Sequence, residues 1–249
     1  MRYTVSLVIG EDGSTMAHIH ELMGCFALAT SKNRALEKLT VAIPQYHGWL
    51  DGHGEDADTP HTVKLSVAEE VHTQDSAGDA GGSDPLRNCD RVAATDRDIT
   101  RCLQLLRYTR TDLTQLITKL PKTAFGYRPS GEPRSVRNAL RHIADVDVWY
   151  LSRIKADPPL DESKRRDLIK WLEYTRSLVR SVLPDLTDEH RSRVFHPRKW
   201  SDGVWPWTAT KILHRLVTHE RQHTSYLKRI LDLPDSPLRT GSSVNGHRT

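Results

Sequence analysis

The feature that most constrains this 249-residue sequence is an apolar helical stripe that includes two histidines. Its side chains recur at intervals of four and three residues: Ile212, Leu216, His219, His223, Tyr226 and Ile230. Residues four apart stack on one face of an α-helix, so both imidazoles point the same way and can share one ion. Burying them without a metal or a hydrogen-bond partner would be costly. We therefore predict a helix from about Thr208 to Leu231 that carries a histidine pair into the protein core.

The histidine pair lies in the letters HERQH, residues 219–223, which match the H-E-x-x-H motif of zinc proteases. Proteases of this type take a third ligand from downstream of the motif. Only 26 residues follow His223 here, and they offer Asp232, Asp235 and His247 near an end that looks unstructured. The sequence therefore disfavours a protease.

The glutamate of this motif, Glu220, is the candidate catalytic residue. It lies about 100° round the helix from His219, so it borders a site at the histidines and does not enter it squarely. There it would orient a ligand or take a proton from metal-bound water. A surface salt bridge is the more common role for such a residue, and we expect it here.

Three further segments with a period of 3.6 residues lie upstream. The first begins near Thr95, and Ser135 and Asp161 can cap the second and third. Four helices of this length favour an antiparallel bundle. His142 lies at the edge of the apolar stripe of the second helix. A single histidine of this kind is more often a hydrogen-bonded core residue than a ligand.

The histidine pair on a facing helix makes a metal site the stronger interpretation of His142. His142, His219 and His223 would then present three imidazoles to one divalent ion and leave a coordination position open for water or substrate, as in catalytic zinc sites. The other histidines that we considered lie on other segments or faces and are expected to have ordinary roles: His18, His20, His190, His196 and His214.

The N-terminal part has a different pattern. Alternating apolar residues predict a strand over residues 2–10, and further strands are expected over 14–22, 24–28 and 63–71. Ser31 can cap a helix that continues to about Leu50, with Pro44 expected to kink or end it. The sequence thus predicts an α+β protein of two domains, a small β-β-β-α-β unit followed by the helical bundle.

Composition suggests where the chain divides. Residues 72–94 are rich in Gly, Ser, Asp and Ala without periodicity, which is typical of a flexible linker, and residues 234–249 resemble a disordered tail. Residues 1–94 carry 7 basic and 14 acidic side chains, whereas residues 95–249 carry 29 and 18. The basic half could attract nucleic acid or an anionic small molecule, although arginines on solvated helix faces explain the same count. We expect domains at 1–71 and 95–233.

Two parts of the sequence resemble known families. The motifs RSVRNALRHIADVDVWYLSRI and WTATKILHRLVTHERQHTSYLKRIL make residues 95–232 similar to the DinB-like (YfiT-like) superfamily of four-helix metalloproteins. That resemblance implies a divalent metal held by His142, His219 and His223. The opening strand, the EDG turn, HELMGC and the ALEKL helix make residues 1–71 similar to the HicB-like antitoxin domain, which implies a toxin partner.

The DinB-like resemblance implies a class of function and no single reaction. It implies a metal-dependent transferase or hydrolase of small molecules, with a low-molecular-weight thiol such as bacillithiol or mycothiol as cosubstrate. Imidazole ligands suit Zn²⁺ and Ni²⁺. The alternative is a non-catalytic, metal-stabilised regulatory protein whose HicB-like domain binds a protein or nucleic acid partner.

The remaining expectations concern location and partners. Three cysteines without a C-x-x-C pair indicate neither a thiolate metal site nor a disulfide framework. No apolar run approaches the roughly 20 residues of a membrane span. We expect a cytoplasmic protein with a small-molecule substrate and no membrane partner, and a homodimer stays open.

Overall fold

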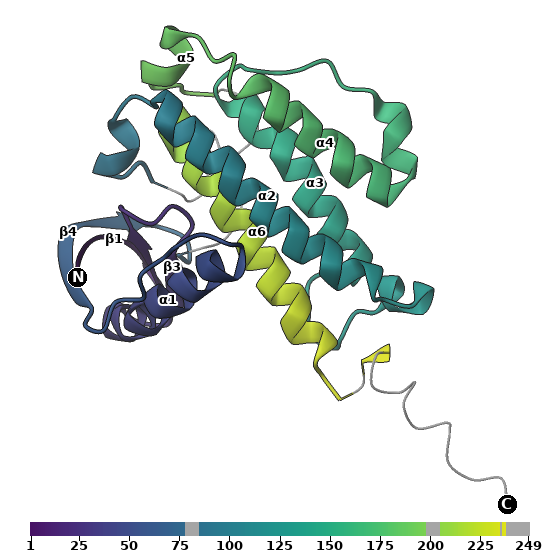
Figure 1. Cartoon of the computed structure of the whole chain (residues 1–249), viewed down its shortest axis with the longest axis horizontal. Helices are drawn as coiled ribbons and strands as arrows, with labels where there is room; N and C mark the ends of the chain where they lie inside the picture. Colours follow the sequence, from purple (N-terminus) through teal and green to yellow (C-terminus); the bar gives the residue numbers. More distant parts are fainter. Residues whose placement is uncertain (78–84, 198–204, 235, 238–249) are drawn as a thin grey trace, which may run out of the picture.

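The computed structural model describes residues 1–77, 85–197, 205–234 and 236–237. A small sheet with one helix is followed by a helical region (Figure 1). The main elements are β1 (Arg2–Gly10), β2 (Thr15–Ile19), β3 (Phe26–Ala29), α1 (Lys32–Gly52), β4 (Lys64–Thr73), η1 (Asn88–Arg91), α2 (Asp96–Thr118), α3 (Val136–Arg153), α4 (Leu168–Val182), α5 (Asp188–Ser192) and α6 (Ala209–Leu231). Short 3₁₀ turns also occur at Lys122–Gly126 and Glu162–Arg166.

The N-terminal sheet has the strand order β3-β2-β1-β4. β1 pairs antiparallel with β2 and parallel with β4, and α1 supplies the crossover between these two parallel strands. The predicted β-β-β-α-β order is confirmed. Pro44 lies inside α1, which continues to Gly52, so of the two effects expected of Pro44, a kink or an end, the helix end is wrong.

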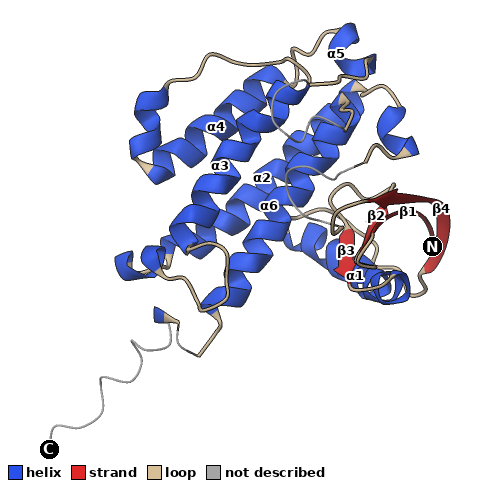
Figure 2. Ribbon diagram, turned by 180° about the vertical axis from the view of Figure 1, so that it is seen from behind, coloured by secondary structure: helices blue, strands red, loops and turns tan. Residues whose placement is uncertain are grey.

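Four long helices, α2, α3, α4 and α6, lie side by side in the second part of the chain (Figure 2). Their apolar faces form the core, for example at Leu105, Ile143, Leu172 and Ile212. Thr95, Ser135 and Thr208 accept hydrogen bonds from backbone N–H groups at the starts of α2, α3 and α6. The cap of α4 is Asp167 and not the expected Asp161, which caps a short 3₁₀ turn instead.

The direction of the helices corrects the simple antiparallel prediction. Contacts between α3 and α6 run antiparallel, from His142 beside His219 to Tyr150 beside Arg215. Contacts between α3 and α4 run parallel: Trp171 bonds to Asp145, and Arg176 to Asp147. For α3 and α4 to be parallel, the connection between them must run back along the length of a helix. The 14 residues 154–167 can do this because α4 is only 15 residues long.

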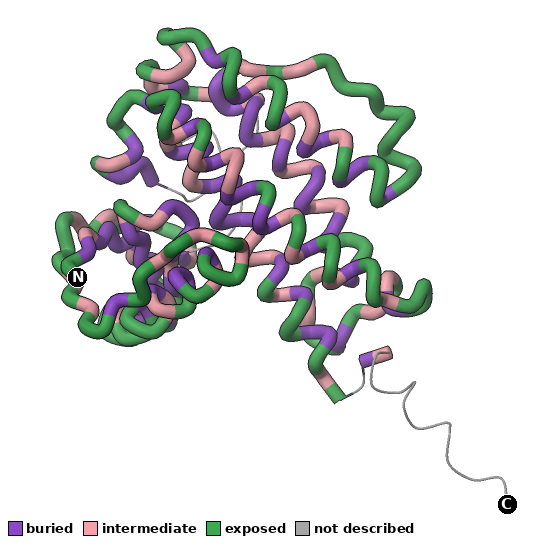
Figure 3. Tube along the Cα trace, viewed as in Figure 1, coloured by how far each residue is buried: buried purple, intermediate pink, exposed green. Residues whose placement is uncertain are grey.

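The sheet unit packs against α2 and α6, and one hydrophobic cluster includes residues of both parts. Trp49 Nε1 donates a hydrogen bond to Asp112 Oδ2 of α2 at 2.7 Å. The guanidinium of Arg221 lies 4.6 Å from the ring centre of Tyr46 and 4.2 Å from that of Trp49. Figure 3 shows buried residues in purple along the helices that face this contact. The two parts therefore share a packed junction.

The interval predicted as a linker contains ordered contacts where the structure describes it. His72 and Thr73 belong to β4, and residues 88–91 form η1, with Asp90 buried. Residues 78–84, and residues 235 and 238–249 of the predicted tail, lie outside the described residues. The division into two domains joined by a flexible linker stays a prediction. Among the described helices, none has the length and apolar character to cross a membrane.

Candidate metal centre

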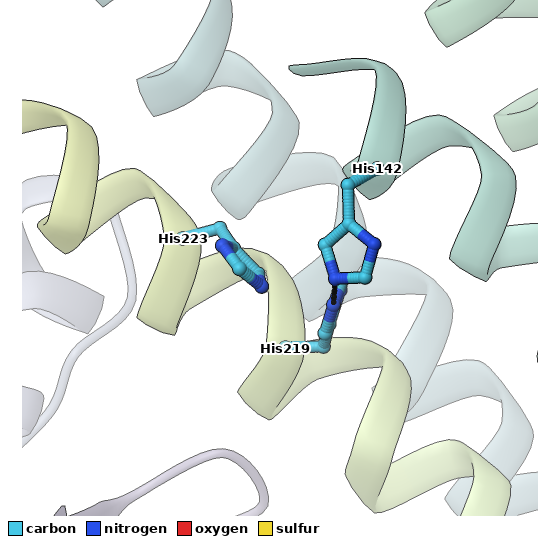
Figure 4. Close-up of side chains that lie close together, drawn as sticks. All are labelled: His142, His219 and His223. Carbon is cyan, nitrogen blue, oxygen red and sulfur yellow. Dashed lines mark hydrogen bonds between the residues drawn. The ribbon is translucent and has the colours of Figure 1, made fainter. Parts of the chain in front are cut away.

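Three histidines meet between α3 and α6, as Figure 4 shows. His142 comes from α3, and His219 and His223 lie one turn apart on α6. Their ligand nitrogens all lie within 4.8 Å of one another, and the Nε2 atoms of His142 and His219 are 3.1 Å apart. Helical spacing therefore brings the three predicted ligands together.

All three imidazoles are held in the neutral form. Burial, followed by the charge of Arg134, lowers the pKa of His142 to about 4. Burial and His142 lower the pKa of His223 to about 3. Burial and the other two histidines hold the pKa of His219 well below its usual value. Neutral imidazole is the form that binds a metal ion.

The residues fit a divalent cation. Two neutral rings can share only one proton between the facing nitrogens of His142 and His219, and Nδ1 of His223 is buried without a hydrogen-bond partner. A buried ring nitrogen without a hydrogen-bond partner lowers the stability of the fold, and three histidines that served only to hydrogen-bond in the core would not carry this cost. His219 is only 4% exposed, whereas His142 and His223 are half-buried. A tetrahedral ion would take three ring nitrogens and keep a fourth position.

Two arginines and several aromatic rings surround the histidines. Arg134 and Arg215 both contribute to the lowered pKa values of His219 and His223. Arg215 Nε donates a hydrogen bond to the Tyr150 hydroxyl at 3.2 Å, and the Tyr150 ring stands edge-on to His219 at 5.9 Å. Positive charge here opposes a bare cation but favours an anion beside it. Sequence reasoning did not single out these arginines. Arg215 lies four residues before His219 on α6, a spacing that could have identified it, whereas Arg134 precedes α3 and has no such relation to the histidines.

Glu220 belongs to a buried ionic cluster on another side of α6. Its Oε1 accepts a hydrogen bond from Arg110 Nε at 2.7 Å, and its Oε2 accepts from Thr109 Oγ1 at 2.9 Å and Arg176 Nη2 at 2.5 Å. Asp147 accepts two further bonds from Arg176. Burial would raise the pKa of Glu220, but the two arginines outweigh it and the pKa is lowered.

The environment of Glu220 contradicts the two roles expected from the sequence, a surface salt bridge and proton transfer at the histidines. The carboxylate is 1% exposed, so the expected surface salt bridge is wrong. Both of its oxygens are occupied by donors on α2 and α4, and neither is available to take a proton from water at the histidines. The position of Glu220 between buried arginines could not be inferred from its own helix.

A second group of ligand-type side chains was also missed. His20, Glu69 and Cys89 place an imidazole nitrogen, a carboxylate oxygen and a sulfur within 4.8 Å of one another. They come from three separate segments with no motif spacing, and Cys89 lies in the predicted linker. Only the folded chain shows the group.

Comparison with known protein families supports the DinB-like part of the prediction. Residues 105–227 match the DinB superfamily. This DinB-like region begins inside α2, ends inside α6 and contains all three histidines. It confirms the DinB-like part of the predicted resemblance, while the HicB-like resemblance of residues 1–71 stays a prediction.

One solved structure is similar to part of the chain. It is described as "YfiT from Bacillus subtilis is a probable metal-dependent hydrolase with an unusual four-helix bundle topology". The two chains are 18% identical with a TM-score of 0.43, and the similarity covers 61% of this chain and 93% of that chain. No curated protein matches the chain.

Proposed function

We propose that His142, His219 and His223 bind one divalent metal ion, Zn²⁺ or Ni²⁺, and that the protein is a metal-dependent transferase or hydrolase of small molecules. The preferred form of this proposal uses a low-molecular-weight thiol as cosubstrate. The observation that carries it is the convergence of three neutral imidazoles, two of them half-buried, within 4.8 Å. Three nitrogen ligands with an open position are typical of catalytic and not of closed structural zinc sites.

The charges around the histidines favour an anionic ligand. A bound metal ion would supply Lewis acidity, which lowers the pKa of a coordinated thiol or water. Arg134 and Arg215 add positive charge that holds a thiolate or carboxylate in the same place. The Tyr150 hydroxyl of α3 accepts a hydrogen bond from Arg215 and so places a polar group beside this charge.

The aromatic side chains beside the site limit access of water. Tyr150 packs on Trp207 with ring centres 5.7 Å apart, and Trp207 in turn packs on Trp149 at 5.3 Å. The Tyr150 ring lies against His219, and both tryptophans pack on Tyr150, while His142 and His223 remain half-buried. A low-dielectric wall strengthens the electrostatic effect of the cation and the arginines on a bound anion.

Cobalt spectroscopy tests the thiol proposal. The starting protein is a Cys89→Ser variant, because the half-buried Cys89 thiol can itself bind cobalt. Addition of a small thiol to the Co²⁺-loaded protein should produce a sulfur-to-metal charge-transfer band. The band should be absent after His219→Ala and retained after His190→Ala, which alters a half-buried histidine of α5.

Turnover provides the second readout. Reaction of an electrophilic substrate with the thiol should fall with His219→Ala and stay unchanged with His190→Ala. If Co²⁺ binds at the three histidines and no thiol alters its spectrum, the thiol-dependent reaction is wrong. Hydrolysis by metal-bound water, or a metal-stabilised binding protein, would then be the better account.

A further inference from the structure

A second group of metal-ligating side chains lies outside the three-histidine site, where the sheet meets the helices. It consists of His20 directly after β2, Glu69 of β4 and Cys89 of η1. One ligand atom of each lies within 4.8 Å of the others, and all three residues are half-buried. Nitrogen, oxygen and sulfur donors thus meet at one point accessible to solvent.

Hydrogen bonds hold two of these donors in place. Ser6 Oγ lies 2.5 Å from His20 Nε2 and donates to Glu69 Oε1 at 2.5 Å. The backbone N–H of Asn88 donates to both carboxylate oxygens of Glu69 at 3.0 Å. Because Asn88 immediately precedes Cys89, this contact also places the thiol beside the carboxylate.

The segment that carries Cys89 is fixed from the other side as well. Arg87 and Asp90 form a buried ion pair with bonds of 2.8 and 2.7 Å. The carbonyl of Asp90 accepts a hydrogen bond from Thr208 Oγ1, the cap of α6, at 2.6 Å. The donor group is therefore preorganised by β1, β4, η1 and the start of α6.

A cavity reaches His20, one of the three proposed ligands. A hollow of about 610 Å³ between the β2–β3 loop and the helices is lined by His20, Met23, Tyr46, Arg101, Gln104 and His214. It provides a route for an ion and its water molecules to His20. A hollow of this size also leaves room for a ligand at an additional coordination position.

The chemistry of Cys89 favours a metal over hydrogen bonding alone. A thiol is a weak donor and a weak acceptor, so the hydrogen bond between Cys89 and Ser6 adds little to the bonds that Ser6 makes with His20 and Glu69. An apolar packing role is equally unsuited to a sulfur that lies within 4.8 Å of an imidazole nitrogen and a carboxylate oxygen. A thiolate is, in contrast, a strong ligand for Zn²⁺.

We propose that His20, Glu69 and Cys89 form a second divalent metal site, suited to Zn²⁺, that ties β4 and η1 together at the junction of the sheet and the helices. This mixed set of nitrogen, oxygen and sulfur donors suits Zn²⁺ and disfavours Mg²⁺ and Ca²⁺, which prefer oxygen alone. On binding, the Cys89 proton is released to solvent and the Ser6 hydroxyl gives up its bonds to the two ligands.

The Cys89 ligand gives this site a signature that the histidine site lacks. Co²⁺ titration of the full chain should produce a sulfur-to-cobalt charge-transfer band without any added thiol. The band should persist in a His142→Ala/His219→Ala double variant, which isolates the second site. It should disappear in Cys89→Ser and remain in Cys25→Ser, a matched change at a buried cysteine.

Metal content supplies the second measurement. Saturation with Zn²⁺ should give about two ions per chain in the wild type and about one after either His20→Ala or Cys89→Ser. The double variant of the histidine site should also retain about one ion, so the two sites can fail separately. A band that survives Cys89→Ser, or a zinc content that neither change lowers, would overturn the second site.

A test on the unaltered chain covers the case in which a variant fails to fold. Bound Zn²⁺ should slow alkylation of Cys89 by iodoacetamide roughly tenfold or more, because the thiolate is then coordinated. Mass spectrometry of the labelled peptide measures the rate at Cys89 alone. Equal rates with and without Zn²⁺ would contradict the proposal.

Discussion

Two sides of α6 carry neighbouring residues of one short motif and use them differently. His219 and His223 face His142 of α3, where three neutral rings converge. Glu220 lies between them in sequence but bonds to groups of α2 and α4, where charged partners enclose it. One side therefore holds three ligand imidazoles, one of which has a buried nitrogen without a hydrogen-bond partner, and the other holds a fully bonded ion cluster.

The difference shows why the letters H-E-x-x-H do not define a chemistry. The histidine spacing of four residues needs only one helix to place both rings on the same face. The role of the glutamate depends on what the adjacent helices present to it, and here they present arginines. A metal site can therefore be separated experimentally from the motif residue that a protease would need.

The largest expected change in folding stability comes from a mutation in the ion cluster around Glu220. Glu220→Gln removes a buried charge and leaves Arg110 and Arg176 with one fewer carboxylate. Breaking a buried ion pair from one side lowers the free energy of unfolding by about 3–5 kcal/mol. Denaturant unfolding measures this change.

A matched surface pair provides the control. Glu189→Gln removes the exposed partner of Arg193 and should change stability by about 0–1 kcal/mol. The folded Glu220→Gln protein should still bind metal at the histidines with unchanged stoichiometry. If the folded variant lost that metal at low temperature, the metal site would depend on Glu220, and the two sides of α6 would not be independent.

A smaller loss is expected where α6 meets the sheet unit. Gly24 has a φ of +82°, and a Cβ added there would overlap Val217 Cγ1. Gly24→Ala should therefore pay about 1–2 kcal/mol for the left-handed backbone, and overpacking against α6 adds about 1–3 kcal/mol. Gly131→Ala has the same backbone conformation with no neighbour within 4 Å, so it reports the first contribution alone.

The comparison of these two glycine variants isolates the contact with α6. If Gly24→Ala and Gly131→Ala lower the melting temperature equally, the sheet unit does not press on α6 at Val217. Metal binding should survive both changes, because neither residue contacts the three histidines.

The pH at which folding stability is lost distinguishes the histidine side of α6 from the Glu220 side. In metal-free protein the folded pKa values of the three histidines lie below the usual 6.5, so the unfolded chain binds more protons as pH falls. Stability present above about pH 6.5 is therefore lost as pH falls toward 4, by about 1.4 kcal/mol per pH unit for each such group.

Glu220 loses its stabilising contribution at a lower pH than the histidines do. Its folded pKa lies below the ordinary value of 4.5, so its stabilising contribution is present above that pH and is lost as pH falls through the lowered pKa. Melting temperatures across pH should show that His142→Ala flattens the upper part of the acid loss and that Glu220→Gln flattens the lower part. Identical profiles for the two variants would contradict the assignment.

Much of the histidine site could be predicted because it depends on local periodicity. His219 and His223 share a helix, and His142 lies on the apolar edge of another, so packing two stripes together was enough. The parallel arrangement of α3 and α4 could not be predicted in this way. It depends on how the connection of residues 154–167 crosses the bundle, which the helical pattern does not encode.

The features that sequence reasoning missed depend on distant contacts. Glu220 is buried because Arg110 and Arg176 approach from other helices, and His20, Glu69 and Cys89 meet only when the sheet, η1 and α6 pack together. The continuous helix through Pro44 has a related origin, since Ile43 and Tyr46 on either side are buried in the core and hold α1 in place.

The most direct test of the central claim is anomalous scattering from crystals of zinc-loaded protein and of its Glu220→Gln and His219→Ala variants. The wild type and Glu220→Gln should both show a peak about 2.0–2.1 Å from a ring nitrogen of His142, His219 and His223. The peak should be lost in His219→Ala. A zinc ion held by Glu220, or no ion at the three histidines when zinc is supplied in excess, would contradict the account.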